Sequence, residues 1–66
     1  MDYRDRISLD PDIMTGEPVI KGTRITVELI LRKLSEGMTF EELLEAYHHL
    51  KREDLLACLA YSADVN

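Results

Sequence analysis

The sequence has one cysteine and no long apolar run. A single cysteine excludes an internal disulfide and fits a reduced compartment, so we expect a cytoplasmic protein. No stretch reaches the ~20 apolar residues that a membrane-spanning helix needs. The charged start, Met1–Arg6, lacks the apolar core of a signal peptide. A chain of 66 residues makes at most one domain, 1–66, with a small core.

Basic residues are also scarce, because eight Lys and Arg stand against 13 Asp and Glu, for a net charge of −5. Residues 1–16 carry two cations against four acids, residues 17–37 four against three, and residues 38–66 two against six. Nucleic-acid binders usually show a strong basic footprint, and this one is weak. If the chain contacts nucleic acid, we expect phosphate contacts from Lys21, Arg24, Arg32, Lys33 and Arg52.

Motifs for catalysis are absent: the sequence has no phosphate loop, no dinucleotide-binding glycine pattern and no Ser-His-Asp spacing. Asp10 and Asp12 flank a proline and suit a turn better than a metal site. The adjacent His48 and His49 would point in different directions, whereas zinc needs about four converging ligands. Cys58 lies in an apolar helical context and is interpreted as a small packed residue. We therefore expect no enzyme activity, no metal and no cofactor.

The segment Gly16–Ile25 is the most informative part of the chain. Its Val19–Ile20 pair predicts a short strand, which we expect to pair with Arg6–Leu9, where polar and apolar residues alternate. Asp10–Asp12 suits the turn between them. The segment's structural motif consists of Gly16, Pro18, Gly22, Thr23 and Arg24.

Arg24 has two interpretations. In the one we favour, its guanidinium pairs with Asp10 or Asp12 and holds the ribbon against the helices. In the other, Arg24 and Lys21 bind a phosphate at the N-terminus of the following helix.

Three helices are predicted after this segment. Thr26 is a plausible N-cap of the first, which ends before Gly37. Thr39 begins the T-x-x-E capping box of the second. The third runs from about Lys51 to Ala63, three or four residues after the second. That spacing is typical of a helix-turn-helix.

The apolar positions of these elements predict one shared core. The third helix contributes a stripe made of Leu55, Leu56, Leu59, Ala60 and Ala63. A core this small gains from covering more apolar surface, so we expect a homodimer that uses Leu29, Leu56 and Tyr61. The predicted core comprises Ile7, Leu9, Val19, Ile20, Ile25, Ile30, Leu34, Phe40, Leu43, Leu44, Leu55, Leu59 and Ala63.

These motifs, taken in order, resemble the DUF433 family of small prokaryotic proteins. The resemblance is carried by Ile7–Pro11, Gly16–Ile25, Gly37–Leu43, Tyr47–Leu50 and Glu53–Tyr61, and covers roughly residues 6–62. Two positions depart from the family pattern. His48 stands where the family often has Pro, and Lys51 where a Ser or Thr often caps the last helix.

The resemblance implies a mainly α fold: a three-helix bundle of the winged or homeodomain-like helix-turn-helix kind, with a short N-terminal β-ribbon. It also implies an antitoxin that binds and neutralises a PIN-like ribonuclease toxin and can regulate its own operon through operator DNA. The alternative is a dimeric helix-turn-helix transcription regulator that has no toxin partner.

Overall fold

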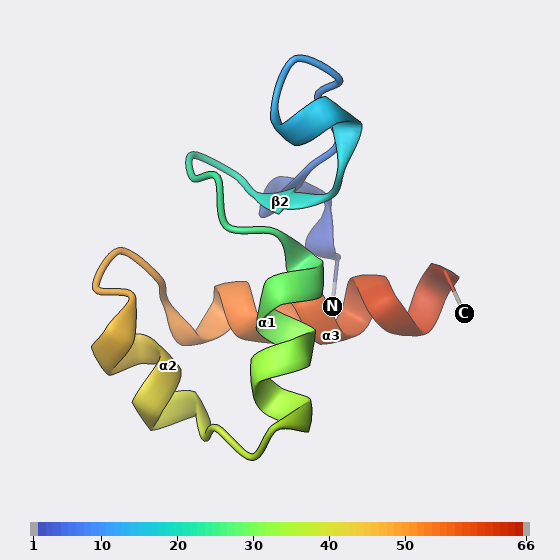
Figure 1. The fold of residues 1–66 in the computed structure, drawn as a ribbon. Coiled ribbons are helices and arrows are strands. Elements are labelled where there is room, and N and C mark those ends of the chain that lie inside the picture. Colours follow the sequence, from blue (N-terminus) through green and yellow to red (C-terminus); the bar gives the residue numbers. More distant parts are fainter. Residues whose placement is uncertain (1, 66) are drawn as a thin grey trace.

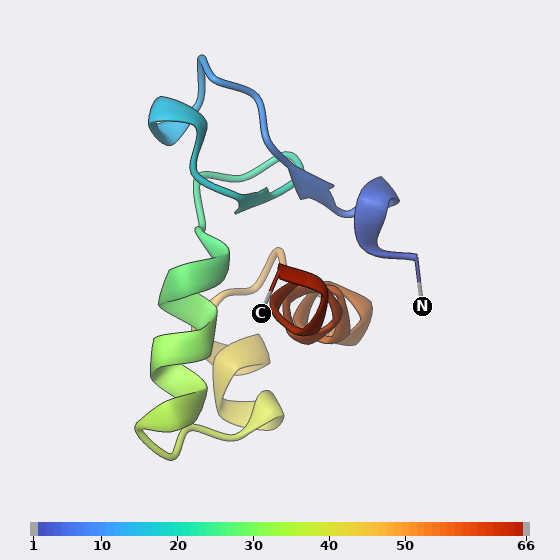
Figure 2. The same cartoon turned by 90° about the vertical axis from the view of Figure 1, so that its right-hand side faces the viewer.

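The computed structural model describes residues 2–65 and is mainly α-helical, as predicted (Figure 1). The longest helix, α3, crosses the middle of the molecule, with α1 on one side and a two-stranded ribbon above it (Figures 1 and 2). The elements are the short 3-10 turn η1 (Tyr3–Asp5), β1 (Ile7–Ser8), the turn η2 (Met14–Gly16), β2 (Val19–Ile20), α1 (Val27–Ser35), α2 (Phe40–Ala46) and α3 (Arg52–Val65).

The ribbon is antiparallel, with Ile7 opposite Ile20 and Ser8 opposite Val19. The prediction that the first strand continues through Leu9 is wrong. The Ser8 hydroxyl accepts a hydrogen bond from the Asp10 N–H at 3.3 Å, which turns the chain away from the ribbon. Leu9 is therefore 58% exposed and does not belong to the core.

The loop between the strands is strained. Met14, Thr15 and Gly16 have φ angles of +50°, +56° and +84° in succession. Only Gly adopts this left-handed region without steric cost, so the first two residues are held there by the loop around them. At the start of the loop, an Asp10 carboxylate oxygen accepts from the Asp12 N–H at 2.9 Å, which makes the turn expected at Asp10–Asp12.

The predicted starts of the first two helices, and the end of the first, are confirmed by their caps. The Thr26 hydroxyl accepts from the Leu29 N–H at 3.0 Å and starts α1. Both bonds of the capping box start α2: Glu42 N–H to the Thr39 hydroxyl at 3.1 Å, and Thr39 N–H to the Glu42 carboxylate at 2.9 Å. Gly37, at φ +100°, takes the left-handed conformation that ends α1.

The core gathers around α3, on a face of that helix that includes Leu55 of the predicted stripe but leaves Leu59 and Ala63 outside. Leu59 is 41% exposed and Ala63 is also exposed, whereas Ala57 and Cys58 are fully buried. Apolar residues occur all round α3, so periodicity alone does not select its inner face. The buried core cluster comprises Ile7, Ile20, Val27, Ile30, Leu43, Leu50, Leu55, Ala57 and Cys58, with Ile25, Leu34, Phe40 and Leu44 partly buried against it.

Five residues, 47–51, connect α2 to α3, slightly more than the predicted three or four. Within residues 2–65, no helix combines the length and the apolar character that crossing a bilayer requires.

Candidate partner-binding groove

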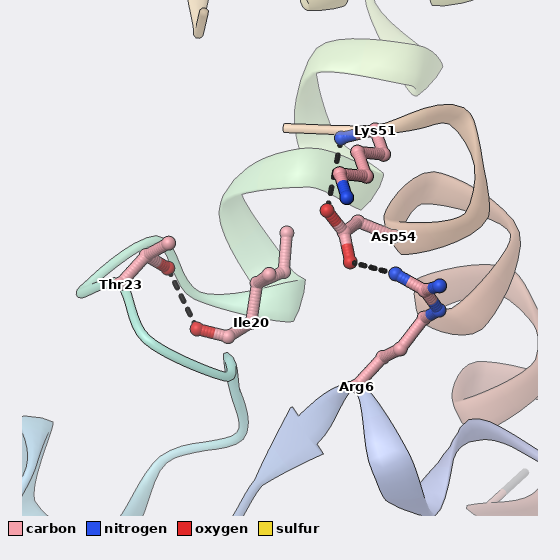
Figure 3. Close-up of polar contacts among 5 residues, drawn as sticks. All are labelled: Arg6, Ile20, Thr23, Lys51 and Asp54. Atoms are coloured by element: carbon pink, nitrogen blue, oxygen red, sulfur yellow. Dashed lines mark hydrogen bonds and ion pairs between the residues drawn. The ribbon is translucent and has the colours of Figure 1, made fainter. Parts of the chain in front are cut away.

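A single buried carboxylate fixes the start of α3 (Figure 3). Asp54 is 8% exposed, and one of its oxygens accepts from the Arg6 guanidinium at 3.1 Å. The other accepts from the backbone N–H of Lys51 at 2.9 Å. From the third helical position, Asp54 thus makes the half of a capping box in which the side chain accepts from the N-cap N–H, and it ties α3 to the residue before β1.

The far end of α3 is held by aromatic and polar contacts with η1. The rings of Tyr3 and Tyr61 meet edge to face, with centroids 5.4 Å apart and planes at 86°. A hydrogen bond to the Asp64 carboxylate raises the pKa of the Tyr3 phenol, because it stabilises the protonated form. These contacts fix the position of Tyr61, which lines the groove described next.

An open groove of about 280 Å³ lies between the start of α1 and the last turns of α3. Figure 2 looks along α3 from its C-terminal end, with the first turn of α1 beside it. The volume lies just below the ~300–1,000 Å³ of sites that enclose small-molecule ligands, so the groove suits one or two protein side chains. It is lined by Glu17, Pro18, Thr26, Val27, Glu28, Leu31, Tyr61, Ser62 and Val65.

The groove is apolar, with acidic residues in its wall. Val65, on α3, is 60% exposed, a high value for a branched apolar side chain. Glu17 and Glu28 are exposed on the α1 side. Glu28 pairs with Arg32 at 2.7 Å, but both side chains are about two-thirds exposed, so water screens this pair strongly. The groove therefore presents apolar surface beside negative charge.

Sequence reasoning missed this groove. Its lining combines two neighbouring segments before and at the start of α1 with the distant end of α3, and Val65 lies beyond the predicted end of the third helix. No motif or spacing marks such a surface, which exists only after α1 and α3 have packed.

The cations predicted to contact phosphates do not form one patch. Since α1 rises ~1.5 Å per residue, its two ends lie roughly 12 Å apart along its axis. The structure divides the five cations into three groups: Lys21 and Arg24 in the turn between β2 and α1, Arg32 and Lys33 in the last turns of α1, and Arg52 at the start of α3.

Two of these five side chains are already engaged. Arg32 makes the ion pair with Glu28. The Arg52 guanidinium carbon lies 5.0 Å from the ring centroid of Phe40, in cation–π geometry. A phosphate would therefore compete with an internal partner at each of these positions.

Arg24 is exposed, and the favoured ion pair with Asp10 or Asp12 is not found among residues 2–65. Its turn is held by its neighbours instead. The Thr23 hydroxyl donates to the Ile20 carbonyl at 2.7 Å (Figure 3) and accepts from the Ile25 N–H at 3.0 Å. Gly22 has φ +83° in the same turn.

The chemistry of the remaining candidate side chains is limited. Cys58 is fully buried, and desolvation raises the pKa of its thiol to about 12. The thiol stays protonated at neutral pH and is a poor nucleophile, in line with a packing role. His48 and His49 are exposed in the turn after α2. In the described part of the chain, no three His, Cys, Asp or Glu side chains gather where they could hold a metal ion.

Comparison with known proteins places the chain in a family. The family model described as "Protein of unknown function (DUF433)" matches residues 7–62. The crystal structure of a DUF433 member protein from Anabaena variabilis is similar, with a TM-score of 0.87 and 31% identity over 92% of this chain and 60% of that one. The uncharacterized protein y4eO of Sinorhizobium fredii is 32% identical over 59 residues, 89% of this chain and 27% of that protein. The chain thus spans just over a quarter of that curated relative. On the match to residues 7–62, the chain belongs to the DUF433 family.

Proposed function

We propose that this chain is an antitoxin-like module that binds and neutralises a PIN-like ribonuclease, and that the groove between α1 and α3 is its docking site. The observation that carries the proposal is the combination of exposed apolar surface with unneutralised negative charge: Val65 and Leu31 lie in the same groove as Glu17. Protein interfaces commonly place an apolar centre inside a charged rim.

The chemistry of the partner supports the same pairing. A ribonuclease needs basic surface to hold the RNA phosphates. The groove offers that surface an acidic residue of opposite charge, Glu17, beside a small apolar hollow, whereas the charge of Glu28 is balanced by Arg32. Complementary charge of this kind steers association and disfavours wrong partners. A partner that occupies the nuclease's basic surface also blocks the access of RNA.

The docking proposal is tested by two substitutions at equally exposed apolar positions. Val65 is 60% exposed in the groove and Leu9 is 58% exposed outside it. We expect Val65→Arg to weaken inhibition of the PIN-like ribonuclease at least about tenfold, since it places a cation against a basic partner. Leu9→Arg should leave inhibition unchanged. The measurement is the concentration of chain that halves RNA cleavage by a purified PIN-like ribonuclease. Equal inhibition by both variants would remove the groove from the interface, and no inhibition by the unsubstituted chain would remove the antitoxin role.

A second candidate is contact with operator DNA, which one feature of the fold favours. The turn between β2 and α1 and the turn between α2 and α3 lie on the same side of the molecule, one above the other (Figures 1 and 2). Lys21 and Arg24 are exposed in the first turn, and His48, His49 and Lys51 in the second. This surface suits phosphates better than bases, because Asp54 already occupies the start of α3.

The salt dependence of binding tests this candidate. Arg24→Ala should weaken binding to the operon's own promoter and to unrelated DNA alike, and should flatten the slope of log K against log salt by about 0.9. Arg4→Ala, which removes an exposed cation of η1, should leave that slope unchanged. Gel shifts without any retardation at low salt, with and without the nuclease, would rule out the DNA role.

A further inference from the structure

The side of α3 opposite its buried residues carries an apolar face that the described residues, 2–65, leave partly exposed. In Figure 2, α1 and α2 lie to one side of α3, and η1 lies above it on the other side. Leu56 and Leu59 of α3 are 39% and 41% exposed. Ala63 is exposed and Ala60 half-buried. We call these four residues the outer face of α3. Leu59, Ala60 and Ala63 follow Leu56 by three, four and seven residues, so all four lie along one stripe of the helix. A second apolar stripe beside the buried one is typical of a helix that packs on both sides.

The order of large and small residues on this face is self-complementary. Suppose that two copies of α3 pack antiparallel about a two-fold axis that passes between residues 59 and 60. Each residue then lies opposite the residue of the second copy that is equally far from the axis on its other side. Leu56 then faces Ala63 of the second copy, and Leu59 faces Ala60. Each leucine meets a gap left by an alanine, which is how side chains interdigitate between paired helices. A two-fold interface requires such self-complementarity, whereas an unrelated partner does not.

The charges at the two ends of the face agree with this arrangement. Arg52 continues the stripe at the N-terminal end of α3, and Asp64 lies in its last turn. Antiparallel pairing brings Arg52 of each copy, which stacks on its own Phe40, to the C-terminal end of the other helix, near Asp64, which accepts from its own Tyr3. A cation is favoured there by the helix dipole. Glu53 lies at the edge of the stripe, where water screens it.

We propose that two copies of this chain associate through the outer face of α3, with the two helices antiparallel. The contact differs from the dimer predicted from the sequence, because Leu29 and Tyr61 are half-buried within the monomer and lie off this face. One helix face is smaller than the ~800 Å² per partner of a standard stable interface, so we expect association in the micromolar range. This pairing does not depend on a ribonuclease partner.

Sedimentation equilibrium of the chain alone tests the association. Leu59→Glu should raise the dimer dissociation constant at least about tenfold, because it buries an unpaired charge against the second copy. Leu9→Glu makes the same change at an exposed leucine outside α3 and should leave the dissociation constant unchanged. Circular dichroism checks that both variants stay helical. A monomer at millimolar concentration, or equal dissociation constants for both variants, would overturn the proposal.

Disulfide trapping tests the orientation. Cys58 can stay in place, because it is buried and its thiol remains protonated. Leu56→Cys and Ala63→Cys chains, mixed in equal amounts and oxidised mildly, should give mainly the mixed disulfide, which mass spectrometry distinguishes. Either variant oxidised alone should cross-link much less. Cross-linking of Leu56→Cys with itself at the level of the mixture would mean parallel helices and would contradict the arrangement.

Discussion

Leu43→Ala should unfold the isolated chain or leave it close to unfolding. Leu43 is completely buried on α2, within the core cluster that contacts α3. Truncating a buried leucine costs about 2–5 kcal/mol, because the substitution loses apolar contacts and leaves a cavity. A domain of this size has a total stability of roughly 3–10 kcal/mol. Thermal and urea unfolding followed by circular dichroism measure the loss.

Leu9→Ala is the matched control. Leu9 was predicted to be a core residue and is 58% exposed, so its truncation should change the free energy of unfolding by less than about 0.5 kcal/mol. A melting temperature that Leu43→Ala leaves unchanged would refute the three-helix core. A large loss from Leu9→Ala would refute the exposed position of Leu9.

Asp54→Ala should be the most damaging substitution of a charged residue, at about 2–3 kcal/mol. It removes the acceptor of the Lys51 N–H at the start of α3 and leaves Arg6 without its partner. The side chain of Arg6 is 35% exposed and can turn to water. Most of the lost free energy of unfolding therefore comes from the Lys51 N–H, which loses its acceptor at the start of α3. Asp54→Asn keeps an acceptor for the cap and should lose about half as much.

The exposed ion pair provides the comparison for this prediction. Glu28→Ala breaks the pair with Arg32, whose side chains are 65% and 63% exposed, and should cost less than about 0.5 kcal/mol. Urea unfolding of the three variants ranks them directly. If Asp54→Ala costs no more than Glu28→Ala, then Asp54 does not anchor α3.

Local signals predicted the boundaries of the fold well. The caps at Thr26 and Thr39, the left-handed residue Gly37 and the pairing of Ile7 with Val19–Ile20 all depend on residues close in sequence or on simple apolar alternation. Such features depend on backbone hydrogen bonds and steric limits that involve only a few residues close in the sequence. The architecture followed, because three short helices and a ribbon have few ways to cover one another.

The inner face of α3 could not be predicted in the same way. Its apolar residues occur on both sides, so the stripe of Leu55, Leu56, Leu59, Ala60 and Ala63 was as plausible as the observed one. The face is decided by Asp54, which must point inward to reach Arg6, 48 residues away in the sequence. A pair so distant leaves no pattern in a single sequence. The groove leaves no sequence pattern either, because it forms only when α1 and α3 are packed against each other.

The groove is tested most directly by nuclear magnetic resonance. The ¹⁵N-labelled chain is titrated with a purified PIN-like ribonuclease, and the chemical shifts of the backbone amides are followed residue by residue. We expect the largest changes at Val27, Leu31 and Val65, whereas the amides of the turn at residues 21–24 should stay nearly unchanged. Changes confined to that turn or to the outer face of α3, or no changes at all, would contradict the proposal that this groove holds the ribonuclease.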